Sequence, residues 1–139
     1  MFKHILMGAA ASACNITIHA LIMATLVQVA RRTSSMFASQ PSLRLIAVMI
    51  ATVSILMASH VSEVLVWSLV YAMIDAAPAG TDLIYFAFVN YTTLGYGDVL
   101  PVERWRLIGP LTAMNGVLLF GWSTAVIFEV MRRAMHHEL

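Results

Sequence analysis

The stretch Thr92-Thr93-Leu94-Gly95-Tyr96-Gly97-Asp98, TTLGYGD in one-letter code, occupies a short break between two long apolar segments of the sequence. Successive backbone carbonyls can face one axis only if some residues take positive φ angles, which side chains oppose and glycine permits. Gly95 and Gly97 supply that freedom. The stretch therefore predicts a loop that works through its backbone oxygens.

The TTLGYGD loop (residues 92–98) resembles the selectivity filter of the potassium-channel pore-loop family. In such filters four copies of a Thr-x-Gly-Tyr-Gly loop form rings of carbonyl oxygens that replace the hydration shell of a K+ ion. A Gly-Tyr-Gly-Asp sequence alone is also a common turn, but the two preceding threonines and the apolar segments on both sides favour the filter. The chain carries one copy, so the resemblance implies a fourfold symmetric homotetramer. It implies K+ coordination by Thr93, Leu94, Gly95 and Tyr96, and filter support by Thr92, Gly97 and Asp98.

The composition indicates a membrane protein. Of the 139 residues, 60% are hydrophobic and only 11% are charged, against about 25% charged residues in a typical soluble domain. The net charge of +1 gives no indication of a nucleic-acid partner. Cys14 is the single cysteine, so no disulfide can form within the chain. The expected partners are a lipid bilayer, K+ and further copies of the chain, without a cofactor.

Three apolar segments are long enough to cross a bilayer, which takes about 20 helical residues. The predicted fold class is an all-α membrane protein with three transmembrane helices, a re-entrant pore helix and a filter loop. The expected divisions are an N-terminal transmembrane helix over 1–32, a cytoplasmic connector over 33–42, a pore domain over 43–133 and a short cytoplasmic tail over 134–139.

The first apolar segment continues past a small-residue sequence that mimics a signal cleavage site, so we expect a retained helix. Gly8, Ala9, Ser12 and Ala13 place small residues at four-residue spacing, which lets helices approach closely. We expect this face to pack against the second helix.

The pore domain resembles the two-helix pore domain of potassium channels. Its segment 82–91 predicts a helix capped by Thr81 or Asp82. With nine or ten residues this helix cannot cross a bilayer, and a re-entrant segment is tolerated only where protein or water covers its backbone. The expected parts are an outer helix over 43–75, a pore helix over 82–91, a filter over 92–98 and an inner helix over 105–131.

Three residues of the predicted pore helix bear on the filter through the resemblance. Tyr85 and Phe86 stand where the family commonly has an aromatic cuff that packs around the filter tyrosine. Val89 stands where some members have a glutamate that hydrogen-bonds the aspartate after the filter. We therefore expect Asp98 to lack that brace, and the stability of the filter to differ accordingly.

The predicted inner helix carries a glycine at a spacing similar to the hinge of the family, Gly116. Val117, Phe120, Thr124 and Phe128 follow at i, i+3, i+7 and i+11, along one helical stripe. They are candidates for the cavity and pore wall, and Phe128 for an apolar constriction that closes by dewetting. Ordinary helix packing explains such a stripe equally well, and Asn115 can face either the cavity or a neighbouring helix.

Three titratable residues lie deep in the apolar segments. His60 and Glu63 are three residues apart and share one face of the second helix, and His19 lies within the first. Ionisable groups inside a membrane are costly and face protein or water. Either Glu63 is a structural brace paired with a histidine, or the group senses protons, because histidine titrates near neutral pH. A metal site formed by the three is a weaker alternative.

Basic residues near helix ends predict the orientation. Arg31, Arg32 and Arg44 flank the first connector, and Arg132 and Arg133 end the third segment. Cytoplasmic loops carry the excess of arginine and lysine. We therefore expect a multi-pass protein of the cell membrane, with the N-terminus outside and the C-terminus cytoplasmic. The small size is typical of a prokaryotic inner-membrane protein.

The sequence predicts a potassium-selective channel that conducts passively. No helix carries arginines at every third position, so a voltage sensor is not expected, and neither is a cytoplasmic ligand-binding domain. The alternative is a non-conducting regulatory subunit that retains a filter-like loop. An enzyme is not expected, because no nucleophile, metal motif or cofactor loop accompanies His60 and Glu63.

Overall fold

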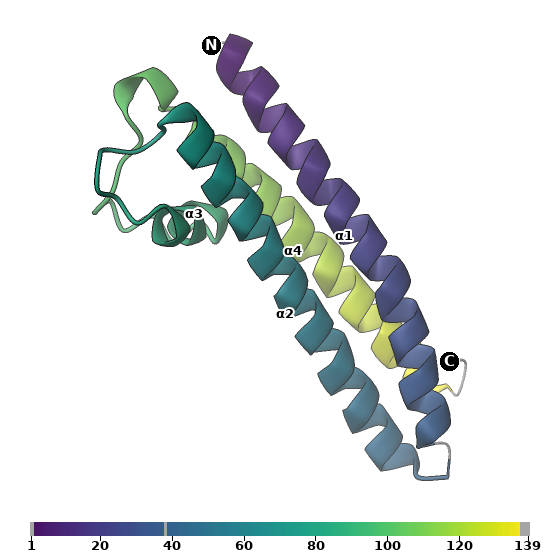
Figure 1. Ribbon diagram of the computed structural model, residues 1–139. Coiled ribbons are helices and arrows are strands. Elements are labelled where there is room, and N and C mark those ends of the chain that lie inside the picture. Colours follow the sequence, from purple (N-terminus) through teal and green to yellow (C-terminus); the bar gives the residue numbers. More distant parts are fainter. Residues whose placement is uncertain (1, 38, 137–139) are drawn as a thin grey trace.

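The computed structural model describes residues 2–37 and 39–136, which form helices and connecting loops without a strand. Three long helices, α1 (Phe2–Met36), α2 (Pro41–Ile74) and α4 (Ile108–Met135), lie side by side, and α2 runs opposite to the other two (Figure 1). The short helix α3 (Leu83–Tyr91) and the TTLGYGD loop lie at the end of the bundle where α1 begins (Figure 1). All three long helices are apolar and long enough to cross a membrane, as the sequence predicted.

The helix boundaries differ from the expected divisions at several points. Helix α1 continues past residue 32 to Met36, so the connector is shorter than 33–42. Pro41 stands in the first turn of α2, where its missing N–H leaves no carbonyl unpaired. A 3-10 turn (Glu103–Trp105) precedes α4, which ends at Met135, inside the expected tail. Residues 137–139 of that tail lie outside the described residues.

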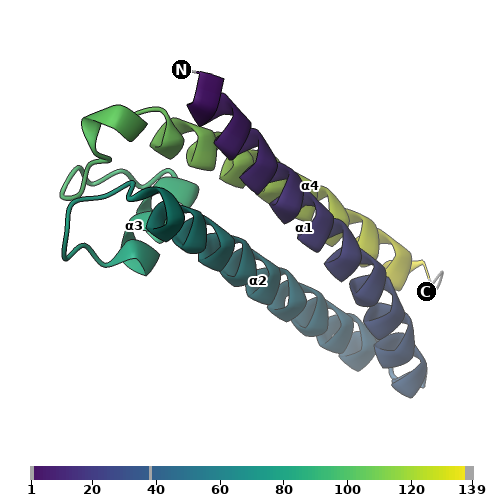
Figure 2. The ribbon, with the colours of Figure 1, turned by 45° about the horizontal axis from the view of Figure 1, so that its top comes forward.

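Helix α3 begins at a side-chain cap. The carboxylate of Asp82 accepts hydrogen bonds from the backbone N–H groups of Ile84 (3.0 Å) and Tyr85 (3.1 Å). These donors have no partner inside the helix, so the cap fixes where α3 starts. Of the two predicted caps, Asp82 is the one used. The helix packs against both α2 and α4, and the turned view shows it grouped with the loops beside the end of α2 (Figure 2).

The interior of the bundle consists of two apolar clusters separated by polar side chains. The cluster near α3 includes Trp67, Tyr71, Phe86 and Tyr91, and the cluster at the other end includes Leu26, Val48, Leu56 and Val130. Between them lies a polar belt of six buried side chains from all three long helices: Asn15, His19, Ser59, Glu63, Asn115 and Ser123. The polar groups therefore lie in the middle of the three apolar helices, where a bilayer offers no water.

The small-residue face of α1 packs differently from expectation. A Cβ added at Gly8 would lie 2.6 Å from the Cδ1 atom of Leu111, so this glycine allows close approach of α4 rather than of α2. Ala9 and Ala13 are exposed in the single chain. The predicted partner was wrong for Gly8 because α1 contacts both α2 and α4, and spacing along one helix does not specify which neighbour faces it.

Gly116 marks the closest approach of α4 to the end of α3. A Cβ at this position would collide with the backbone carbonyl oxygen of Tyr91. The structure thus gives this glycine a packing reason, and a hinge at Gly116 stays a prediction. Gly121, five residues further along α4, has open space around its Cα.

We predict opposite effects for alanine at these two glycines. Gly116→Ala forces α3 and α4 apart and should lower the free energy of unfolding by about 1 to 3 kcal/mol, the usual range for overpacking. Gly121→Ala meets no neighbour and should raise the stability by up to about 1 kcal/mol, because alanine favours helix. Thermal unfolding in detergent, followed by circular dichroism, measures both. Equal effects of the two substitutions would contradict the close approach at Gly116.

Candidate functional site

The TTLGYGD loop has an alternating backbone. Thr93 (φ 61°), Gly95 (φ 54°) and Gly97 (φ 80°) take positive φ angles, whereas Leu94 and Tyr96 between them do not. In an extended strand successive residues face opposite sides. A regular alternation in the sign of φ instead turns successive carbonyls toward the same side. The positive φ angles predicted for Gly95 and Gly97 are present.

The positive φ angle of Thr93 was not predicted. The backbone N–H groups of Leu94 and Gly95 both donate to the carbonyl of Val89 (3.0 and 3.3 Å), so the loop folds back on the end of α3. A left-handed residue just after a helix allows this closure. For a residue with a side chain the conformation costs about 1 to 3 kcal/mol. Sequence reasoning missed it because positive φ was assigned to glycine alone.

Asp98 has a brace, contrary to expectation. The hydroxyl of Tyr85 donates a hydrogen bond of 2.6 Å to Oδ2 of Asp98. This bond raises the pKa of Tyr85 above its usual value, so the hydroxyl keeps its proton at neutral pH. The prediction considered only a glutamate at the position of Val89. A tyrosine one turn earlier on α3 supplies the bond instead.

The aromatic cuff is not formed within one chain. Phe86 is buried and its ring packs on Tyr71, with 5.0 Å between the ring centroids. Among the described residues neither Tyr85 nor Phe86 stacks on Tyr96. A cuff around Tyr96 therefore requires contacts from another chain and stays a prediction.

The four residues of the predicted stripe on α4 do not share one environment in the structure. Val117, Thr124 and Phe128 are exposed along the helix. Phe120 lies against the interior, where its ring centroid is 4.6 Å from that of His60 and 5.4 Å from that of Tyr91. The pore-lining role of all four stays a prediction, and for Phe120 the contacts favour packing.

Asn115 faces the neighbouring helices. Its Oδ1 atom accepts hydrogen bonds from Nδ2 of Asn15 on α1 and from Nε1 of Trp67 on α2, each at 3.0 Å. The sequence left this orientation open. Asn15 was not singled out, although an amide in the middle of an apolar helix is a signal for such a contact.

Glu63 lies at the centre of a hydrogen-bonding hub that we define as Glu63 with the residues it contacts, Ser59, His19, His60 and Tyr91. Oε1 accepts from Ser59 Oγ (2.9 Å) and pairs with His19 Nδ1 (2.7 Å). Oε2 pairs with His60 Nδ1 (2.9 Å) and accepts from the Tyr91 hydroxyl. The carboxylate is completely buried, and its partners come from α1, α2 and α3.

The number of donors fits an ionised carboxylate. A carboxylate has about four acceptor sites, and the hub places four donor groups on it if each histidine carries its proton on Nδ1. His60 also contacts α4, because its Nε2 atom is 2.9 Å from Oγ of Ser123. All four helices are therefore joined through Glu63 and His60.

The two histidines differ in their capacity to carry a positive charge. A protonated His60 would donate from Nδ1 to Glu63 and from Nε2 to Ser123, so both N–H groups would have partners. Within the described part of the chain, Nε2 of His19 is buried without a hydrogen-bond partner. A proton there would leave a buried donor unsatisfied, which costs about 1 to 3 kcal/mol. The contacts of His60 can thus accommodate an N–H group on each ring nitrogen, and those of His19 cannot.

Sequence reasoning identified three residues of the hub and missed the other residues that hydrogen-bond to them. His19, His60 and Glu63 were predicted as a group, and the structure brings all three together. Ser59 lies one turn before Glu63 on the same helix, a local signal that was available. Tyr91 and Ser123 come from other helices, and no local pattern indicates them.

The ligand atoms of His19, His60 and Glu63 all lie within 4.8 Å of one another, a grouping compatible with a metal ion. The Nδ1 atoms of His19 and His60 and both carboxylate oxygens of Glu63 already take part in hydrogen bonds of the hub. A metal would have to replace those bonds, so the donor set favours a hydrogen-bonded brace.

A family model described as ion channel matches residues 59–133, which is more than half of the chain. The match begins at Ser59 of the hub and includes α3, the TTLGYGD loop and most of α4. No curated protein and no solved structure matches the chain.

We predict that Glu63→Gln weakens the hub. A glutamine offers two acceptor sites on one oxygen, so about two of the four donors lose their partner, at about 1 to 3 kcal/mol each. We expect a loss of about 2 to 5 kcal/mol in the free energy of unfolding, measured by titration with SDS in mixed micelles. Glu103→Gln removes an exposed carboxylate and should change stability by less than about 1 kcal/mol. A stabilised Glu63→Gln variant would show that burial of the charge outweighs its hydrogen bonds.

Proposed function

This chain belongs to the ion channel family, and we propose that it forms a potassium-selective channel as a homotetramer, through which K+ passes down its electrochemical gradient. The observation that carries the proposal is the alternation of φ along the TTLGYGD loop. Such a backbone presents a row of carbonyl oxygens, the ligands that replace the water around K+ in a filter. The chain is a multi-pass membrane protein, so the row would lie where a permeating ion loses its hydration.

The homotetramer is supported by the fact that one loop cannot enclose an ion by itself. A single row of carbonyls surrounds an ion on one side only, and four rows are needed to enclose it. The loop also leaves apolar side chains uncovered: Leu94 is 53% and Tyr96 68% exposed. Val117 and Phe128 are exposed on the adjoining face of α4. Neighbouring copies around a common axis would cover these side chains and complete the filter.

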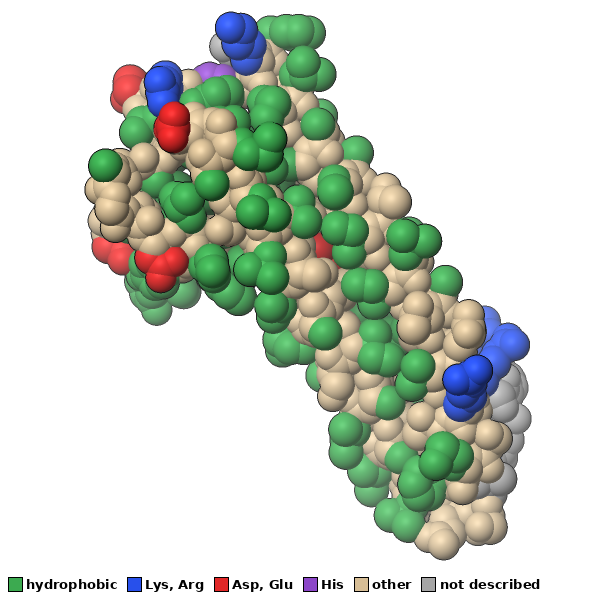
Figure 3. Space-filling model, viewed as in Figure 1, with side chains coloured by type: hydrophobic (Ala, Val, Ile, Leu, Met, Phe, Trp, Pro, Cys, Tyr) green, Lys and Arg blue, Asp and Glu red, His purple; other side chains and the backbone are tan. Residues whose placement is uncertain are grey.

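The charges near the loop favour a cation. The carbonyl end of a helix carries a partial negative charge of about half an elementary charge, and α3 ends directly before the loop. Acidic side chains gather at the α3 end of the molecule on the face drawn in Figure 3. At this end Asp75 and Glu103 are ion-paired with Arg104 and Arg106, so Asp82 and Asp98 are the acidic side chains that would enrich cations at the outer mouth.

The hub suggests how conduction would respond to pH. Tyr91 donates to Glu63 and is followed directly by Thr92 of the loop. The groups of the hub that carry or exchange a charge are His19 from α1, His60 and Glu63 from α2, and Tyr91 from α3. A proton on His60 would create an ion pair with Glu63 and a donor to Ser123 on α4. The charge of His60 would therefore alter contacts with α3, which precedes the loop, and with α4, which follows it.

We predict that alanine at Gly97 abolishes K+ flux and that alanine at Gly80 does not. Both glycines have positive φ angles, 80° and 82°, and a Cβ at either would meet no atom within 4 Å. The two alanine variants should therefore suffer the same backbone strain, but only Gly97 lies in the TTLGYGD loop. Flux into liposomes that contain the purified chain, with K+ against Na+ and with barium as a blocker, measures the effect.

Two outcomes of that assay would contradict the proposal. Absence of flux through the wild-type chain would favour the non-conducting regulatory subunit. Equal flux of K+ and Na+ would retain a channel and overturn its selectivity.

We predict that His60→Gln removes a pH response of the open probability. Between pH 5 and 8 the open probability of the wild-type channel should change, and that of the variant should stay constant. His4→Gln is the control, because His4 packs on Trp105 (4.8 Å between ring centroids) away from the hub. Single-channel recording in planar bilayers gives the measurement. The same pH response in wild type and His60→Gln would leave the hub as a structural brace.

A further inference from the structure

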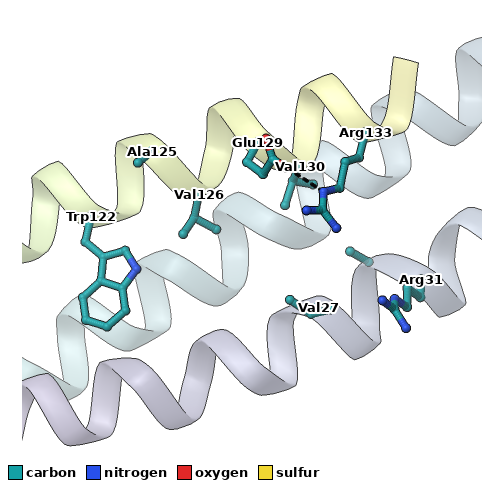
Figure 4. A pocket seen from close by; sticks show the side chains of 9 residues that line it. Val27, Arg31, Trp122, Ala125, Val126, Glu129, Val130 and Arg133 are labelled. Carbon is teal, nitrogen blue, oxygen red and sulfur yellow. Dashed lines mark hydrogen bonds and ion pairs between the residues drawn. The ribbon is translucent and has the colours of Figure 1, made fainter. Parts of the chain in front are cut away.

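A groove runs between α1 and α4, away from the filter. It encloses about 310 Å³ and has Trp122 at one end (Figure 4). Val27 and Ala30 of α1 and Val126 and Val130 of α4 contribute apolar walls. Arg31 and Arg133 line it toward the other end (Figure 4). The groove thus has an apolar interior and a basic mouth.

The length of the groove matches one leaflet of a bilayer. Trp122 and Arg133 are eleven positions apart on α4, which corresponds to about 16 Å along a helix axis. The hydrocarbon core of a bilayer is about 30 Å thick. A ligand that lay along the groove would therefore extend from the headgroup region to the middle of the membrane, as one acyl chain does.

The side chains at the mouth carry a net positive charge, which favours an anionic ligand. Glu129 is paired with Arg132 (2.9 Å) and with Arg133 (2.6 Å). Arg31 has no ion pair or hydrogen bond from its side chain to any described residue. Of the side chains that line the groove, Arg31 and Arg133 are basic and Glu129 is acidic, which leaves one net positive charge at this mouth. Guanidinium groups bind phosphate through paired N–H donors.

A second copy of the chain is the other candidate occupant, and the charges disfavour it. Of the described acidic residues, four belong to the α3 end: Asp75, Asp82, Asp98 and Glu103. Glu63 is buried in the hub, and Glu129 is already paired with Arg132 and Arg133. A parallel neighbour would therefore bring no free described carboxylate to the level of Arg31. An anionic lipid supplies both the charge and the apolar chain.

We propose that the groove between α1 and α4 binds an anionic phospholipid, with one acyl chain between the two helices and the phosphate at Arg31 and Arg133. The site involves α1, which lies outside the matched family domain. It does not depend on potassium selectivity. Because α4 also carries Val117, Thr124 and Phe128 on another face, an occupied groove would fix the position of α4 relative to α1.

Quenching of Trp122 by brominated lipids tests the proposal. The full chain is reconstituted in phosphatidylcholine vesicles with increasing fractions of brominated phosphatidylglycerol, or of brominated phosphatidylcholine at equal bromine content. The quenching lost in Trp122→Phe is the Trp122 signal, since Trp67 and Trp105 remain. We expect the anionic lipid to half-quench Trp122 at a several-fold lower fraction than the zwitterionic lipid.

The arginine variants define the site. Arg31→Gln and Arg133→Gln should each weaken the preference for the anionic lipid about fivefold, the effect of one basic residue near a charged surface. Arg32→Gln is the matched control, because Arg32 is the next residue of α1, is exposed and does not line the groove. It should leave the preference unchanged.

Four results would overturn the proposal. Equal quenching by both lipids would show that the groove has no preference for an anionic headgroup. Equal effects of Arg31→Gln and Arg32→Gln would show that the headgroup does not bind at Arg31. Absence of Trp122 quenching by either lipid would indicate that a second copy fills the groove. Addition of excess inorganic phosphate separates a lipid from free phosphate: the quenching should persist, and its loss would show that the arginines hold phosphate without the chain.

Discussion

The arrangement of the bundle depends on one buried carboxylate, Glu63, and on the four groups that surround it. An ionised group in the apolar interior of a membrane protein is costly unless it is fully hydrogen-bonded. Glu63 obtains its partners only when His19 of α1, Ser59 and His60 of α2, and Tyr91 of α3 are all in place. His60 extends the contact to Ser123 of α4. Apolar packing alone is non-directional, so this hub gives the bundle its register.

The same constraint positions the TTLGYGD loop. Tyr91 is the last residue of α3, and its hydroxyl is held by Glu63 while its carbonyl lies against Gly116 of α4. At the other end of the loop, Tyr85 holds the carboxylate of Asp98. Both ends of the loop are thus fixed to helices, and the residues between them carry the alternating φ angles. A loop fixed at both ends has little conformational entropy left to lose on binding a ligand.

Local features were predictable from the sequence, and contacts between distant segments were not. The order of the helices, the cap at Asp82 and the positive φ angles of Gly95 and Gly97 follow from residue types and their neighbours. The grouping of His60 with Glu63 follows from helical spacing. In contrast, the bond from Tyr85 to Asp98, the partner of Gly8 on α4 and the orientation of Asn115 each depend on which helices become neighbours. The positive φ angle of Thr93 could be predicted only from the way α3 ends. It lets Leu94 and Gly95 donate to the carbonyl of Val89, although threonine itself disfavours this conformation.

The first helix contributes side chains to the interior of the protein, although the matched family domain begins at residue 59. It contributes two fully buried polar residues, His19 to Glu63 and Asn15 to Asn115. If α1 were absent, the carboxylate would lose one of its four donors, and Asn115 would lose one of its two. Both losses would fall beside the helices that carry the loop. A helix held only by apolar contacts can be exchanged for lipid at little cost, whereas one that satisfies buried polar groups cannot. In this chain the helix outside the family domain is therefore a structural part of the loop's support.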